Sequence, residues 1–249
     1  MSFDFGESPV GGGSSIKQAQ VGQHEARLLG IVHLGMYEDT FGGKKKPAAP
    51  FVCALFELKS GEEGGGVNDD GTPIVVHKSF PLKKGDRAFL TKFMKALLTT
   101  EEYRQYEAGV LEGGFDDLIG RPVLIDMKGS KEKDDNGDPK YTNATEVSKM
   151  PTKLAKLTEE LEGEPIGHVT HAAMTEEALR AIPPFEIYTK VEKSVNFPGS
   201  RVEEVLEGIR EKEPEFGTRK QKDDSKEEGD AQAPPEQQRE DLDESEDFS

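Results

Sequence analysis

The chain has 249 residues, 33% of them hydrophobic, and a formal net charge of −17 at neutral pH. This length gives room for one domain of ordinary size and a small extension, and the low apolar content indicates disordered ends. The N-terminus lacks a signal peptide's basic and apolar regions, and no apolar run reaches the roughly 20 residues of a membrane span. A single cysteine, Cys53, excludes an intramolecular disulfide, so we expect a cytoplasmic protein without a membrane partner.

The charge is distributed unevenly along the chain. Residues 16–100 carry 12 Lys and Arg against 9 Asp and Glu, whereas residues 101–222 carry 18 against 26. Residues 223–249 carry 2 basic against 12 acidic residues, a net charge of −10. An acidic protein is not usually expected to bind nucleic acid. Because most of the acid lies far from the mildly basic first half, however, net charge alone does not decide the class of partner.

A long, bent strand is the first element that the sequence predicts. Residues 1–20 are rich in Gly and Ser and are expected to be flexible. The apolar run 26–36 then predicts a strand, and glycine inside a strand favours a bulge or sharp bend, which Gly30 and Gly35 would provide. A loop over residues 38–49 follows, with three consecutive lysines.

Two further strands and a helix follow this loop. The short apolar runs 51–58 and 73–82 are bounded by Pro or Gly and are typical of strands. Over residues 86–98 the apolar positions change to helical spacing, with Asp86 as the expected N-cap. Residues 101–108 are expected to extend or to follow this helix.

Two more strands complete the predicted domain. Residues 121–128 alternate in polarity, with Val123, Ile125 and Met127 on one face, and residues 140–147 are rich in β-branched and aromatic side chains. The order of three strands, a helix and two strands is that of the OB-fold, a five-stranded barrel. We therefore expect a mainly β, OB-fold-like barrel with one helix between strands three and four. This fold hosts binders of oligonucleotides, oligosaccharides and proteins, so it suggests a function without proving one.

The barrel domain is predicted to span residues 21–150. A partly helical extension, 151–216, and a disordered acidic tail, 217–249, follow it. Within the extension, residues 182–188 are expected to be extended, and one face of a short helix is formed by Val202, Val205, Leu206 and Ile209. The extension packs onto the barrel or serves a partner, and the sequence leaves both readings open.

Basic residues on the barrel face and on the two loops by which OB-folds grip oligonucleotides are candidate phosphate contacts. They are Lys44, Lys45 and Lys46 in the first loop, Lys131, Lys133 and Lys140 in the loop between the last two strands, and Arg27, Lys78 and Lys128 on the strands. Lysines are common in loops of any function, and nearby acidic residues offset the second cluster. The basic side chains on the strands could equally be solvated.

Three aromatic residues are candidate platforms for base stacking. Tyr37 and Phe41 flank the first loop, and Tyr141 opens the last strand. All three lie beside basic residues, as a surface that stacks bases and pairs with phosphates requires. Packing in the core or in turns is the alternative for each, and it is the expected role of Phe51 and Phe56.

Patterns of enzymatic or metal chemistry are poor, so we expect a protein that is not an enzyme and carries no cofactor. The sequence contains neither a G-x-x-x-x-G-K-[ST] phosphate loop nor a G-x-S-x-G nucleophile elbow. His168 and His171 lack partners at metal-ligand spacing, which favours structural or solvent roles. Cys53 lies in an apolar strand and is expected to be buried and unreactive.

Residues 21–58 contain an A-R-L stretch, an L-G pair, a loop with G-K and a strand ending in F-E-L. Together with GRPVLIDMK, YTNATEV and residues 182–209, these motifs resemble a family of bacteriophage single-stranded DNA-binding proteins, over residues 20–215 in all. The resemblance implies an OB-fold, sequence-indifferent binding of single strands in phage DNA replication or recombination, and a location in the host cytoplasm. It also implies an acidic tail that recruits replication or recombination proteins. In that family the tail commonly ends in the aromatic itself, whereas here Ser249 follows Phe248.

The acidic segment 223–249 cannot bury enough apolar area to offset the entropy of ordering, so we expect it to be disordered. An acidic run before an aromatic can imitate a nucleic-acid strand, with charge in place of phosphate and a ring in place of a base. We expect it to compete with DNA and to bind partners through Asp241, Asp243, Glu244, Glu246, Asp247 and Phe248. A solubilising tail is the alternative. For the whole chain the alternative is an OB-type protein–protein adaptor without nucleic-acid binding, and a homodimer is left open.

Overall fold

The computed structural model describes residues 17–38, 40–41, 44–61, 65–69, 71–134, 136–162 and 164–219. The predicted acidic tail from residue 220 onward and the first 16 residues of the predicted flexible segment lie outside this range. Residues 17–20 were expected to be flexible, but one of them, Ala19, is anchored in the fold, whereas the other three are exposed. Ala19 is 3% exposed, and its carbonyl accepts a hydrogen bond from Thr142 Oγ1 at 3.0 Å.

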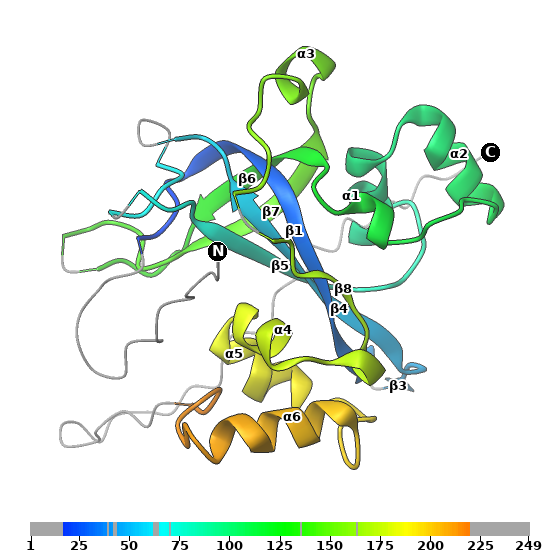
Figure 1. Cartoon of the computed structure of the whole chain (residues 1–249), viewed down its shortest axis with the longest axis vertical. Helices are drawn as coiled ribbons and strands as arrows, with labels where there is room; N and C mark the ends of the chain where they lie inside the picture. The colour runs from blue at the N-terminus through cyan, green and yellow to red at the C-terminus, as the bar shows by residue number, and fades with distance from the viewer. Residues whose placement is uncertain are drawn as a thin grey trace, which may run out of the picture. The chain divides into compact units, whose positions relative to one another are not determined.

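A six-stranded β-sheet forms the body of the fold, with helices on either side of it (Figure 1). Its hydrogen-bonded order is β5-β4-β1-β6-β7, all antiparallel, and a short β8 pairs in parallel with β1. The strands are β1 (Gly22–Tyr37), β4 (Ala49–Leu58), β5 (Val75–Pro81), β6 (Pro122–Gly129), β7 (Thr142–Lys149) and β8 (Gly167–Val169), and a separate hairpin joins β2 (Thr40–Phe41) to β3 (Lys44–Lys45). The fold is mainly β as predicted, the five predicted strands are present, and β8 is an addition.

Helices lie mainly in two groups along the chain. They are α1 (Phe89–Leu97), α2 (Thr100–Ala108), α3 (Thr152–Ala155), α4 (Glu176–Ala181), α5 (Pro184–Glu186) and α6 (Arg201–Arg210), with 3₁₀ turns η1 (Asp116–Leu118) and η2 (His171–Ala173) and a π-helical turn η3 (Ile187–Val191). In the described part of the chain, none of them combines the length and apolar character needed to cross a membrane.

The sheet is not closed into a barrel. Among the described strands, β5 pairs only with β4 and β7 only with β6. The two edge strands nevertheless approach each other, with Cα atoms of β5 and β7 within 8 Å. Helix α1 also lies against β7 and β5 at this seam. The result is a strongly bent sheet that encloses a core on its inner face.

Both faces of β1 and β4 are buried, which explains why their sequences are nearly continuous apolar runs. On the inner face, side chains such as Leu28 and Phe56 pack with Phe93 of α1. On the outer face, side chains such as Val32 and Leu55 pack against α4, η3 and α6. The extension 151–216 thus supplies a second core on the back of the sheet. The sequence left open whether the extension packs on the strands or serves a partner, and in the structure it packs on the sheet.

Both edges of β1 are also occupied. One edge pairs with β4 from Ala26 to Tyr37. The other pairs with β6 over Gly22–Arg27 and then with β8 over Gly30–Val32. At its end, Met36 accepts a hydrogen bond from the Val195 amide at 2.8 Å and donates one to Asn196 Oδ1 at 2.7 Å. Because buried backbone N–H and C=O groups require partners, the extension completes the hydrogen bonding of this strand.

Two glycines allow the extension to approach β1 so closely. Register shifts between Leu28 and Gly30 and between His33 and Gly35 confirm the predicted bulges. A Cβ at Gly30 would lie 2.8 Å from Ile166 Cβ, beside β8. Gly35 has a φ of +113°, and a Cβ there would collide with the Ser194 side chain. The glycines therefore serve the docking of the extension as well as the bend of the strand.

Two local predictions are wrong, and a third is confirmed. The N-cap of α1 is Ala88 rather than Asp86, because the preceding residues form a turn in which the Ala88 amide donates to Gly85 O at 3.0 Å. The predicted extended segment 182–188 instead contains α5 and the start of η3, since proline is tolerated in a first helical turn. The predicted apolar face of α6 is confirmed, and all four of its residues are buried.

Arg27 fastens the extension to the sheet from inside the fold. Its guanidinium donates hydrogen bonds to the carbonyl oxygens of Gly120, Thr158 and Glu159 at 2.6, 2.8 and 2.6 Å. The side chain is 8% exposed and also lies 3.1 Å from Glu160 Oε1. Its donors are therefore used within the protein, against the prediction that Arg27 contacts DNA.

Replacing Arg27 with alanine should lower the free energy of unfolding by about 3 kcal/mol, because buried carbonyl groups would lose their charged donor. The matched control is Arg104→Ala, whose side chain is 73% exposed and forms an ion pair with Glu101. It should change stability by less than about 0.5 kcal/mol. Urea denaturation of both variants measures the difference. Equal effects would show that Arg27 does not hold the extension in place.

Candidate nucleic-acid interface

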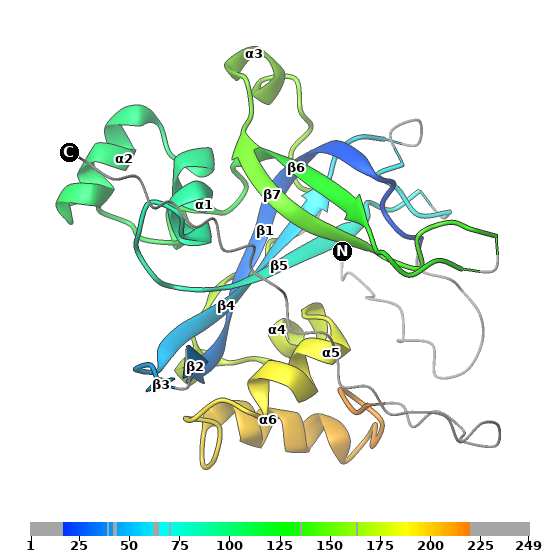
Figure 2. The same ribbon diagram turned by 180° about the vertical axis from the view of Figure 1, so that it is seen from behind.

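At one end of the sheet, β1 ends and β4 begins beside the short strands β2 and β3 (Figure 2). A lysine and two aromatic rings meet there. The ring centroids of Tyr37 and Phe51 are 6.0 Å apart. Lys190 Nζ lies 4.5 Å from the centroid of Tyr37 and 4.8 Å from that of Phe51. Lys45 and Lys46, both exposed, follow in the adjoining hairpin. We call these five residues the hairpin surface.

Lys190 reaches the hairpin surface because the residues that follow η3 are hydrogen-bonded to the end of β1. The residues just after this π-helical turn, 194–196, form the hydrogen bonds to Met36 described above. Met36 directly precedes Tyr37, so the same contact holds Lys190 beside the Tyr37 ring. π-helical turns are uncommon and are frequent at functional sites.

The acidic groups nearest to Lys190 and Lys45 are Glu186 and Glu38. Among the described residues, no carboxylate lies within 4.0 Å of Lys190 Nζ. Glu186, one turn earlier in the chain, is 5% exposed; burial raises the pKa of its carboxyl, and the nearby Lys190 cation opposes this shift. Lys45 lies 3.3 Å from Glu38, with the two side chains 82% and 48% exposed. Such an exposed pair is worth at most about 1 kcal/mol and can exchange partners.

A second aromatic group lies along the same face of the sheet. Phe185 is 43% exposed, and its ring lies 5.4 Å from that of His77. Phe51 of β4 pairs with Pro81 of β5, and His77 lies four residues before Pro81 on the same strand. Because side chains alternate between the two faces along a strand, those of His77 and Phe51 lie on the same face of the sheet. Burial and the nearby Lys78 lower the pKa of His77 to about 4, so this ring is neutral at pH 7.

The second predicted loop lies at the opposite end of β1 from the hairpin surface, as both views show (Figures 1 and 2). Lys128, Lys131, Lys133 and Lys140 are exposed there, as is Tyr141, at 45%. Lys140 Nζ, however, lies 3.2 Å from Glu132 Oε2. The fold therefore does not bring the two predicted lysine clusters together, and the second one is partly neutralised.

Lys78 is placed differently from its prediction. Its Nζ lies 5.5 Å from the centroid of Phe89, at the start of α1, and burial lowers its pKa. It therefore covers the inner core rather than an open barrel face. The side chains of Phe41 and Lys44 lie outside the described residues, although their backbones pair with each other in the β2–β3 hairpin.

Sequence reasoning missed Lys190, Phe185 and His77, and it assigned Phe51 to the core. Phe51 is only partly buried and packs at the margin of the outer core. No sequence signal identified Lys190, because its position depends on pairing between segments far apart in the chain. No protein-family model matches this chain, and no curated protein matches it.

The histidines that sequence treated as structural link β1 to β8. His168 Nε2 lies 2.9 Å from His33 Nε2, and His168 Nδ1 lies 3.6 Å from Asp116 Oδ2. Burial, together with His168 and His171, lowers the pKa of His33 to about 4. Two ring nitrogens at this distance share one proton, so a second proton is disfavoured. In the described part of the chain, no group of three or more His, Cys, Asp or Glu is placed to hold a metal.

Cys53 is fully buried, as expected, and burial raises the pKa of its thiol to about 12. Because the thiolate is the reactive form of cysteine, this side chain is inert at neutral pH. It packs in the outer core beneath Glu186 and η3. It is therefore part of the support for the hairpin surface and not a reactive group.

Acidification from pH 7 to about pH 4 should destabilise the protein through the histidine pair. An unfolded chain protonates His33 near its ordinary pKa of 6.5, whereas the folded chain does so only near 4. Between these values the unfolded state binds more protons, so stability falls as the pH falls. A His33→Gln variant should show a shallower decline in urea unfolding across this range. A decline as steep as that of the parent would show that the pair does not titrate in this way.

Proposed function

We propose that this chain binds single-stranded DNA without sequence preference, through the hairpin surface and the neighbouring Phe185. The observation that carries the proposal is the cation of Lys190 held over Tyr37 and Phe51, next to the lysines of the β2–β3 hairpin. Cations that pair with phosphates beside aromatic faces that stack bases are the elements of sequence-tolerant single-strand binding. Each stacked base contributes about 1–3 kcal/mol in such proteins.

The arrangement of the strands supports an OB-fold, which is a partly open five-stranded barrel. Helix α1 lies between the third and fourth long strands of the chain, β5 and β6. Closing the order β5-β4-β1-β6-β7 into a barrel would join β5 to β7, and these are the strands that approach each other. The hairpin surface then includes the loop between the first two long strands, one of the two loops by which OB-folds bind oligonucleotides.

The resemblance to phage single-stranded DNA-binding proteins leads to the same proposal. On this view the chain coats single strands during phage replication or recombination and has no catalytic activity. Its acidic tail, in which Asp247 and Phe248 precede the final Ser249, would compete with DNA for the hairpin surface and recruit replication or recombination proteins. The exposed lysines of the second loop would provide further phosphate contacts for longer strands.

Fluorescence anisotropy with labelled oligo-dT at two salt concentrations tests the proposal. Binding should weaken as salt rises, because each neutralised phosphate releases counterions. Lys190→Ala should weaken binding about three- to tenfold at low salt and reduce the log–log salt slope by about 0.7 to 1. Lys153→Ala, which removes an exposed lysine of α3, is the matched control. Equal losses in the two variants would contradict a specific role for Lys190, and no binding at either salt would favour a protein–protein adaptor.

Deleting residues 223–249 should tighten oligo-dT binding, most at low salt, because the deletion removes a net charge of −10 that competes with DNA. Phe248→Ala provides the comparison, since it keeps the charge and removes the ring. It should leave most of the competition in place and weaken capture of a replication partner. An unchanged or weaker affinity of the deletion variant for oligo-dT would exclude competition by the tail.

A further inference from the structure

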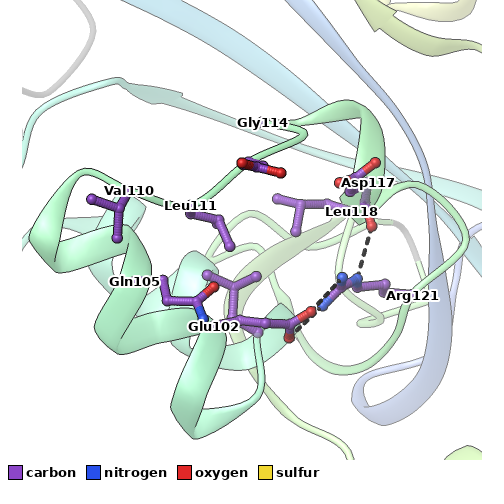
Figure 3. A pocket seen from close by; sticks show the side chains of 10 residues that line it. Glu102, Gln105, Val110, Leu111, Gly114, Asp117, Leu118 and Arg121 are labelled. Atoms are coloured by element: carbon purple, nitrogen blue, oxygen red, sulfur yellow. Dashed lines mark hydrogen bonds and ion pairs between the residues drawn. The ribbon is translucent and has the colours of Figure 1, made fainter.

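A cavity of about 440 Å³ lies beside α2, between this helix and residues 109–121. Leu111 and Leu118 point into it from the loop side, and the ion pair of Glu102 and Arg121 lies across from them (Figure 3). Leu118 is fully buried at the floor, whereas Val110 at the rim is 65% exposed. The cavity lies toward the low end of the range of about 300–1,000 Å³ that is typical of ligand sites.

Helix α2 is firmly held although none of its residues is buried. Its first turn has a capping box between Thr99 and Glu102, and Gly109 ends it in the left-handed conformation. Arg121 donates to both carboxylate oxygens of Glu102 at 2.9 Å and to the carbonyl oxygens of Leu97 and Asp117. A helix that adds little to the core is thus fixed in position, with a cavity along its side.

The loop that forms the other wall of the cavity, residues 109–121, also has a defined backbone conformation. A Cβ at Gly113 would collide with the Asp117 carboxylate, so glycine allows the loop to pack against Asp117. Gly113 and Gly114 both have positive φ, of +85° and +64°, which only glycine adopts readily. Both walls of the cavity, α2 and the loop 109–121, therefore have a fixed backbone.

The charge of the cavity determines which ligands it can accept. Glu112 and Asp117 are exposed at its rim, and the one cation in its lining, Arg121, is already paired with Glu102. The pairing holds the pKa of the Glu102 carboxyl near 2, so this group remains ionised at neutral pH. An uncompensated negative rim around an apolar floor repels phosphates and favours a cationic ligand with an apolar group.

We propose that this cavity binds a segment of another protein in which an apolar side chain is flanked by Lys or Arg. The apolar side chain would pack on Leu111 and Leu118, and the cations would face Glu112 and Asp117. Neither end of this chain has that chemistry. Residues 1–16 contain Asp4 and Glu7 and no Lys or Arg, and the tail is strongly acidic. The cavity is thus a second interaction site, opposite in charge to the hairpin surface.

Titration of the full-length protein with three short blocked peptides, KKLLKK, KKSSKK and EELLEE, tests the proposal. Amide chemical shifts locate the binding site, and calorimetry gives the affinity. KKLLKK should bind and shift amides within residues 98–121, whereas the other two peptides should bind at least about tenfold more weakly, which corresponds to 1.4 kcal/mol. Comparable binding of KKSSKK would show charge attraction alone and overturn the proposal.

The double variant Val110→Ser, Glu112→Lys should weaken KKLLKK binding by about tenfold. Its matched control is Val21→Ser, Glu159→Lys, in which an exposed valine, 59% accessible, and an exposed glutamate are changed elsewhere. The amide spectrum of each variant reports directly whether it is folded. Shifts confined to residues outside 98–121, or equal losses in the two double variants, would overturn the proposal whether or not the protein binds oligo-dT.

Discussion

The pairing of β1 is the constraint on which the rest of the structure depends. This strand is buried on both faces and hydrogen-bonded on both edges, and three separate segments share its second edge. A backbone group left unpaired in such a position costs about 1–3 kcal/mol. The extension 151–216 is therefore an integral part of the sheet's hydrogen bonding and of its outer core. Gly30 and Gly35 make this possible by removing the side chains that would block β8 and residues 194–196.

This constraint also creates the hairpin surface. Tyr37 and Phe51 are neighbours because β1 and β4 pair, and Lys190 joins them because residues 194–196 dock on Met36. The lysine therefore reaches the rings only when both the sheet and the extension have folded. A surface assembled in this way is sensitive to changes far from it, such as the loss of the Arg27 contacts that hold the start of the extension.

Much of the fold could be predicted from the sequence, because its signals are local. Alternation placed Val123, Ile125 and Met127 on the buried face of β6, and helical spacing identified the buried face of α6. The site was less predictable, since residues 37, 51 and 190 carry no common motif and meet only through tertiary pairing. The wrong prediction for Arg27 has the same origin. This residue was expected at the surface because no feature of the neighbouring sequence indicates that three distant carbonyl groups surround it. Even β8 is only three residues long and depends on Gly30 for its place.

A net charge of −17 and DNA binding are compatible when charge is separated in space. At physiological ionic strength the screening length is about 8 Å, so a strand at the hairpin surface responds mainly to the charges beside it. The acidic tail is proposed to compete for the same surface, and because it belongs to the same chain, its effective concentration would be on the order of millimolar. Weak attraction between the tail and the lysines would therefore suffice for competition, which DNA would overcome by contacting several cations at once.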